Sequence, residues 1–310
     1  MDSLNLSDEV SRKNAFSPLD SSVAEKKEIL TSLKVFLHSK IFQVVSDIRR
    51  GELTEVEVFQ GKKVKTDIAI NEKFTTELGY RVLIAGPKLG LDDAAVLDVL
   101  ISLYLQKNGV NGILECKYKE IAILLGYKVN KNGSIGGSAK STVERSLLRL
   151  RKSNIEIRDK SGFLLWCDTI LTGLKPTGRG KGFKLILQLN SSFIPHYKDK
   201  KIYWLNLETL NSLNRESEKA IYRMICSESR SELRVPLSHF YNMFYEDSGK
   251  LKNSEKLYSI KQELKGAIKS LVSKGILDAD SEIDDNYNLI LLVSRYLPTN
   301  SPQLASPVSH

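Results

Sequence analysis

Apolar positions recur at helical spacing in two stretches of the chain, and the first stretch has a recognisable order. The sequence DDAAVLDVLISLYLQKN, from Asp92 to Asn108, is apolar on most sides and predicts a buried helix that begins at an acidic pair. Residues 120–126 predict a short amphipathic helix that ends at a glycine. The next segment, AKSTVERSLLRLRKSNI, places Val143, Leu147 and Leu150 on one stripe, while its Ser141 and Glu144 have capping-box spacing. Helix, short helix, turn, longer helix and hairpin follow one another as in a winged helix-turn-helix.

The hairpin of this first unit carries a glycine-rich tip. Residues 184–189 alternate polar and apolar side chains and predict a strand, and residues 162–174 are rich in β-forming residues. Between them lies PTGRGKGF, in which Arg179 and Lys181 separate three alternating glycines. A nucleotide-binding loop is disfavoured, because a strand follows instead of a helix and the G-x-x-x-x-G-K-[ST] spacing is absent. Two interpretations stay open here: a solvated hairpin tip, or a basic tip that contacts a polymer of phosphates.

The same order of elements recurs nearer the C-terminus. SEKAIYRMICS predicts an amphipathic helix, residues 235–240 begin a short helix, and EKLYSIKQELKGAIKSLVSKGIL predicts a longer one, followed by a strand at 289–294. The sequence therefore predicts a second winged helix-turn-helix. The tip of its hairpin is acidic, with Asp278, Asp280, Glu282, Asp284 and Asp285. Because a phosphate backbone would repel such a tip, we expect this second wing not to lie on DNA.

The remaining segments flank these two units. Residues 24–50 have near-helical apolar spacing and predict a helix, whereas residues 53–84 predict short strands and turns. Residues 1–22 and 297–310 are rich in Ser, Asn and Pro and predict disordered tails. The expected fold class is α+β, with two tandem winged helix-turn-helix domains between disordered N- and C-terminal tails. The first domain is expected at 23–200, with a helix and strand extension, and the second at 201–296.

Charge favours DNA as the partner of these units. The 310 residues contain 46 Lys and Arg against 37 Asp and Glu, a net charge of +9 that permits a nucleic acid or an acidic membrane. The distribution is more informative, since residues 138–160 hold seven basic and three acidic side chains, and residues 172–201 hold seven basic and one acidic. The longer helix and the wing of the first unit are thus basic together.

Neither a cofactor nor a metal site is expected. The three cysteines, Cys116, Cys167 and Cys226, form no C-x-x-C pair, which also suits a reducing cytoplasm. A rolling-circle nicking enzyme, which needs a metal site and a nucleophilic tyrosine, is disfavoured, because the four histidines are single and scattered. The N-terminus lacks the pattern of an export signal, and no run reaches about eighteen apolar residues, so we expect a cytoplasmic protein without a membrane partner.

Two tandem winged helices with these sequences resemble the iteron-binding plasmid replication initiators of the TrfA-like kind. The resemblance covers roughly Leu91 to Arg295, and its most specific parts are the G-G-S-x-x-S-T-V-E-R-S-L-x-R-L run and the A-I-Y-R pattern. It implies that each winged helix reads part of a repeated origin sequence. It also implies a dimer that is silent or autoregulatory, a monomer that opens the origin, and recruitment of the host helicase and replicase. Strand-rich residues 53–84 and 163–189 could offer a sheet edge for self-association.

The residues expected to bind DNA lie on three elements. By the resemblance, Lys140, Ser141, Thr142 and Arg145 occupy the first recognition helix, and Lys256, Ser259, Lys261, Gln262 and Lys265 occupy the second. Arg149 is expected on the outward side of the first helix, and Arg179 and Lys181 are expected to reach the DNA backbone or the minor groove from the wing. The expected function is sequence-specific binding of double-stranded DNA at origin repeats to initiate replication. The alternative, a winged-helix transcriptional regulator without a replication function, would share all of these residues.

Overall fold

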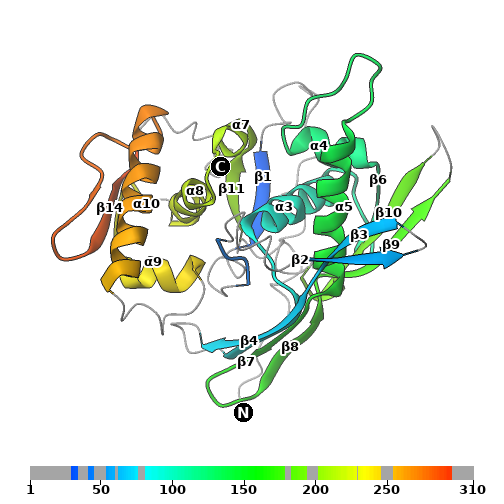
Figure 1. Cartoon of the computed structure of the whole chain (residues 1–310), viewed down its shortest axis with the longest axis horizontal. Coiled ribbons are helices and arrows are strands. Elements are labelled where there is room, and N and C mark those ends of the chain that lie inside the picture. The colour runs from blue at the N-terminus through cyan, green and yellow to red at the C-terminus, as the bar shows by residue number, and fades with distance from the viewer. Residues whose placement is uncertain are drawn as a thin grey trace, which may run out of the picture.

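Two units with the same topology form the body of the molecule, which we describe from a computed structural model (Figure 1). The structure describes residues 29–33, 41–44, 54–59, 62–75, 81–178, 183–193, 202–228, 230–245 and 254–294. Both expected tails, at 1–22 and 297–310, lie outside these residues. No helix in the described ranges is long and apolar enough to span a bilayer.

The first unit contains the elements α3 (Leu91–Gln106), β6 (Ile113–Cys116), α4 (Tyr118–Leu124), α5 (Gly137–Lys152), β9 (Leu171–Thr177) and β10 (Lys184–Leu189). Its three strands lie in the order β6-β10-β9, so the last strand is central. Val143, Leu147 and Leu150 are fully buried, which confirms the stripe expected on the longer helix. That helix begins four residues before Ser141, so the spacing of Ser141 and Glu144 marks no cap. The first winged helix-turn-helix is present as expected.

The second unit repeats this arrangement with α8 (Glu216–Glu228), β12 (Glu232–Pro236), α9 (Leu237–Phe244), α10 (Ser254–Ser273), β13 (Glu282–Ile283) and β14 (Asn288–Leu292). Its strands lie in the order β12-β14-β13, again with the last strand central. On α10, Leu264 and Leu271 are fully buried and Ile260 and Ile268 nearly so. The two tandem winged helices and the α+β class are therefore confirmed.

A four-stranded sheet lies beside the first unit, in the order β4-β5-β7-β8. It contains β4 (Ala69–Thr75), β5 (Arg81–Pro87), β7 (Asn154–Arg158) and β8 (Leu164–Thr169), and the ribbon of β2 (Thr54–Phe59) and β3 (Lys62–Asp67) precedes it. The strands expected at 53–84 are thus present. The prediction that the upstream strand of the wing occupies residues 162–174 was wrong, because β8 pairs with β7 and the wing strand begins only at Leu171. A single residue, the fully buried Ile170, separates the strands of the two sheets.

The helix expected at 24–50 was also wrong where the structure describes it. Residues Ile29–Leu33 form β1, which pairs antiparallel with β11 (Ile202–Asn206), just before the short helix α7 (Leu207–Ser212). A five-residue segment with three apolar residues suits either a helix or a strand, and here a partner strand far along the sequence decides. This pairing crosses the boundary that we predicted at residues 200 and 201.

The first helices of the two units, α3 and α8, come into contact. Arg223 of α8 places its Nη2 2.6 Å from Oδ2 of Asp98 on α3, and both side chains are only 2% exposed. Nearer the start of each helix, Lys219 lies 2.8 Å from Asp92 at the surface. A buried ion pair of this kind is costly to break, so it holds the two winged helices in a defined relation.

Candidate nucleic-acid interface

The start of α5 presents the polar face that the sequence predicted for the first recognition helix. Lys140 and Ser141 are exposed, and Thr142 and Arg145 are half-buried. The Thr142 hydroxyl donates to the carbonyl of Ser138 one turn earlier, so it is engaged within the helix. Of these side chains, Lys140 and Ser141 are the most accessible to a ligand that approaches the helix.

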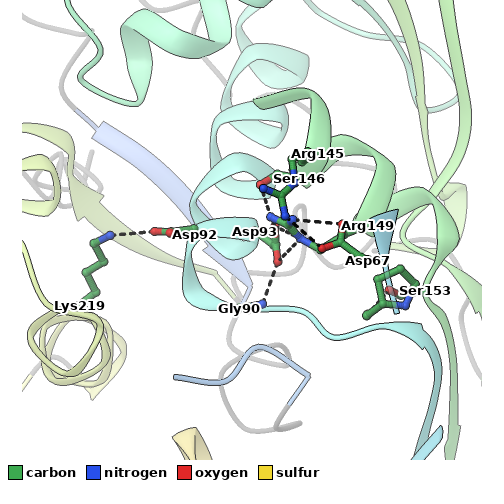
Figure 2. Close-up of polar contacts among 10 residues, drawn as sticks. Asp67, Gly90, Asp92, Asp93, Arg145, Ser146, Arg149, Ser153 and Lys219 are labelled. Atoms are coloured by element: carbon green, nitrogen blue, oxygen red, sulfur yellow. Dashed lines mark hydrogen bonds and ion pairs between the residues drawn. The ribbon is translucent and has the colours of Figure 1, made fainter. Parts of the chain in front are cut away.

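Arg149 does not lie on this face, and the prediction that it points outward was wrong. Its guanidinium is buried and donates from Nε and Nη2 to the carboxylate of Asp93, with a shortest distance of 2.7 Å (Figure 2). Asp93 is fully buried and also accepts from the backbone N–H of Gly90, which closes the start of α3. Burial alone would lower the pKa of Arg149, but the carboxylates of Asp93 and Asp67 outweigh it and raise the pKa. Arg149 therefore joins α5 to α3.

Arg145 lies between this buried network and the surface. Its Nη2 is 3.4 Å from Oδ1 of Asp67, at the end of β3, and Arg149 reaches the other oxygen of the same carboxylate at 3.4 Å (Figure 2). The Arg145 side chain is 34% exposed, so the contact with Asp67 covers it only in part. The ribbon β2-β3 thus meets the recognition helix at the arginine expected to read DNA.

An aromatic pair joins α4 to the wing beneath Lys140. Tyr118, the first residue of α4, stacks on Phe183 with ring centroids 5.8 Å apart and planes 13° apart. The Lys140 ammonium lies 5.4 Å from the Tyr118 centroid and 5.9 Å from that of Phe183. Burial, with a smaller contribution from the Glu144 carboxylate, raises the pKa of Tyr118 to about 12, so its hydroxyl stays protonated at neutral pH. Three elements of the winged helix therefore meet at one lysine.

The wing itself is confirmed as a hairpin, with Thr177 opposite Lys184 at its last described pair. Gly178 follows with a φ of 73°, a left-handed conformation that favours glycine and turns the chain into the tip. Arg179 and Lys181 lie outside the described residues. On the strands, Lys175 is exposed, and Lys184 forms an ion pair with Glu115.

The turn between α4 and α5 is an ordered small hairpin that we did not predict. Val129 and Ile135 form a bridge, and the backbone N–H of Asn130 donates to the carbonyl of Ser134 at 2.8 Å. Exposed lysines, Lys128 and Lys131, lie in this turn beside the start of the recognition helix. An Asn-Gly pair at residues 132 and 133, flanked by β-branched residues, is a known hairpin signal and could have revealed it.

On the second recognition helix, α10, the exposed predicted residues are Ser259, Gln262 and Lys265. Lys261 is half-buried, and its ammonium lies 4.5 Å from the ring centroid of Tyr287. Lys256 belongs to α10, but its side chain lies outside the described residues. This helix therefore offers a polar face on which one lysine is already held by an aromatic ring.

The second wing is a tight turn, which the carboxylate of Asp284 stabilises by hydrogen bonds within the turn. Asp284 accepts from the backbone N–H of Asn288 at 2.7 Å and from its side-chain amide at 2.9 Å. These hydrogen bonds hold the pKa of Asp284 below its ordinary value. The other acidic residues expected at this tip are exposed, but they do not all lie in the turn: Asp285 does, whereas Glu282 is on β13 and Asp278 and Asp280 precede that strand. The turn itself thus carries two acids, of which Asp285 is directed to solvent.

Comparison with known proteins bears on this arrangement. No protein-family model and no curated protein sequence matches the chain. The structure is similar to the crystal structure of the Pi initiator protein in complex with iteron DNA, with a TM-score of 0.50 and 11% identity over 87% of this chain and 99% of that chain. This chain therefore shares its fold with that protein. A similar likeness holds for domains 2 and 3 of RctB, with a TM-score of 0.50 and 14% identity over 73% of this chain and 91% of that chain.

Metal-ligand clusters are absent from the described residues, and two of the three cysteines, Cys116 and Cys226, are buried or half-buried. No group of three or more His, Cys, Asp or Glu in the described ranges could hold a metal ion. Burial raises the pKa of Cys116 and of Cys226 to about 12 each, which makes both thiols poor nucleophiles at neutral pH.

Proposed function

We propose that this protein binds double-stranded DNA in a sequence-specific manner at the direct repeats of a replication origin and initiates plasmid-type replication there. One observation carries the proposal: two winged helices of identical topology, each with a polar, lysine-bearing recognition helix, share their fold with an initiator crystallised on iteron DNA. We propose the cytoplasm as its location, because a plasmid origin lies there.

Each recognition helix would enter a major groove. Side chains of the first turns of such a helix contact base edges, and Arg or Lys favours guanine while Gln favours adenine. Arg145 and Gln262 are the residues best suited to these roles, since the first is only partly covered and the second is exposed. Because the Arg223–Asp98 pair holds the two units together, both helices would engage one repeat as a single body.

Contacts with the DNA backbone would supply much of the affinity. Arg179 and Lys181 of the first wing stay proposed phosphate contacts, and the lysines of the small hairpin, Lys128 and Lys131, extend that set. Each phosphate contact contributes a slope of about 0.9 to the dependence of log affinity on log salt. The acidic second wing would contribute no such contact.

Self-association and recruitment complete the proposed function. The edge strand β8 and the turn before it expose Phe163, Leu164 and Leu165, at 69%, 42% and 50%. An exposed apolar edge strand is suited to pairing with a second copy. Binding of the host replicative helicase and replisome components is part of the proposal by resemblance to initiators.

The proposal is tested by selecting the DNA fragments that the protein binds from its own replicon. We expect fragments with direct repeats that also support replication of a linked marker when the protein is supplied. Arg145→Ala and Gln262→Ala should each reduce affinity for the selected repeat by about 1–3 kcal/mol and leave random DNA almost unaffected. Lys160→Ala, a change in the exposed β7–β8 turn, is the matched control. Binding to a single operator without repeats or replication would instead indicate a transcriptional regulator.

A further inference from the structure

The two wings share a feature that the sequence did not reveal. Phe183 immediately precedes β10, and Tyr287 immediately precedes β14. Because β10 and β14 are the central last strands of sheets with the same order, the two aromatic residues occupy equivalent positions. Each ring lies under a lysine of its own recognition helix, Lys140 in the first unit and Lys261 in the second. The two winged helices thus repeat one construction with different sequences.

Core packing does not account for Tyr287. Its side chain is among the exposed large hydrophobic ones, at 47%, and its φ is 57°, a left-handed value that is uncommon for a bulky residue. The surrounding turn maintains this conformation, since the Tyr287 carbonyl accepts from Leu237 N–H at 2.8 Å and its N–H donates to the Asp284 carbonyl at 3.2 Å. Unfavourable backbone conformations that the surroundings enforce cluster at functional sites. The ring is therefore held outward at a conformational cost.

An aromatic face restrains a lysine without neutralising it. The ammonium is attracted by the ring, and the N–H donors that point away from the ring stay available to an anion. A lysine that is already restrained loses less side-chain freedom when it binds a phosphate. The ring can thereby increase affinity for DNA without a charge of its own.

We propose that Phe183 and Tyr287 are positioning residues, which hold Lys140 and Lys261 toward the DNA at the junction of recognition helix and wing. The inference rests on the proposed function. In the second unit, the acidic tip cannot contact phosphates by charge attraction. The inference gives this wing another role, because its Tyr287 ring positions Lys261. In the first unit, Tyr118 extends the same support, because it stacks on Phe183 under Lys140.

The experiment compares Tyr287→Gly, Tyr287→Phe, Lys261→Ala and the double variants with wild type on one selected repeat. Tyr287→Gly removes the ring and also relieves the left-handed backbone, so its unfolding temperature should equal or exceed that of wild type. Its affinity should nevertheless fall about two- to fivefold, the equivalent of about 0.5–1 kcal/mol for an exposed cation–π contact. Tyr287→Phe keeps the ring and should bind like wild type.

The double variants separate positioning from structure. In the Lys261→Ala background, Tyr287→Gly should cause no further loss, and Phe183→Leu should likewise lose its effect when Lys140 is replaced by Ala. The inference would be overturned if Tyr287→Gly lost no affinity, or lost the same affinity with and without Lys261. In either case, duplex binding by wild type would still uphold the proposed function. A wild-type chain that binds no duplex would overturn both.

Discussion

Replacing Arg149 by Ala separates a structural arginine from a DNA-binding one. The guanidinium donates three hydrogen bonds, at 2.7–3.1 Å, to a carboxylate of Asp93 that is 0% exposed. Removing one partner of a buried ion pair typically costs about 3–5 kcal/mol, because the other charge stays buried. At about 2–4 °C per kcal/mol for domains of 150–250 residues, the unfolding temperature should fall by roughly 6–20 °C.

The assay is thermal unfolding at neutral pH, followed by titration of the selected DNA repeat well below the transition. Arg149→Ala should unfold earlier, yet bind DNA with nearly wild-type affinity while folded. Arg151→Ala is the matched control, because Arg151 is exposed in the same last turn of α5 and its loss should change stability by less than about 0.5 kcal/mol.

A double variant tests the cause. Asp93→Asn with Arg149→Leu removes both charges and keeps an acceptor for the Gly90 N–H, so it should recover much of the lost stability. The reasoning would be refuted if Arg149→Ala unfolded at the wild-type temperature and lost affinity for DNA, since Arg149 would then face the ligand.

Three further predictions concern other contacts. Burial would raise the pKa of Glu218, but hydrogen bonds from Ser270, Lys274 and the Asn214 backbone outweigh it and lower the pKa below 4.5. Glu218 therefore stabilises the fold above about pH 4.5 and loses this contribution as pH falls through the folded pKa. Glu218→Gln should be less stable at pH 7, and its free energy of unfolding should fall less steeply as the pH is lowered. An unchanged slope would contradict this. Arg223→Leu should destabilise by about 3–5 kcal/mol, and Arg223→Leu with Asp98→Leu by clearly less, as measured by denaturant unfolding; equal losses would remove the pair as the link between the units. Lys128→Ala with Lys131→Ala should lower the salt slope of DNA binding by about one to two and leave sequence preference intact, and an unchanged slope would remove the small hairpin from the interface.

The local pattern of the chain was sufficient to predict both winged helices. Period-3.6 stripes such as Val143, Leu147 and Leu150, and the alternation at 184–189, depend only on which face of an element is buried, and the structure buries those faces. The outward position of Ser141 followed from the same periodicity, whereas that of Lys140 came from the family resemblance. The asymmetry between a basic first wing and an acidic second wing was also evident from residue order alone.

Tertiary structure decided those strands and side-chain contacts whose partners are distant in sequence. Residues 29–33 became a strand because β11, far along the chain, lies beside them. In the sequence pattern, Arg149 does not differ from the exposed basic residues near it. Its burial depends on the ion pair with Asp93 on another helix. Likewise, nothing in the sequence placed Tyr287 beneath Lys261, because that contact depends on how a turn and a helix pack. Periodicity reports which side of an element is buried, whereas the partner of each buried or half-buried charge is chosen by long-range packing, which a local pattern does not contain.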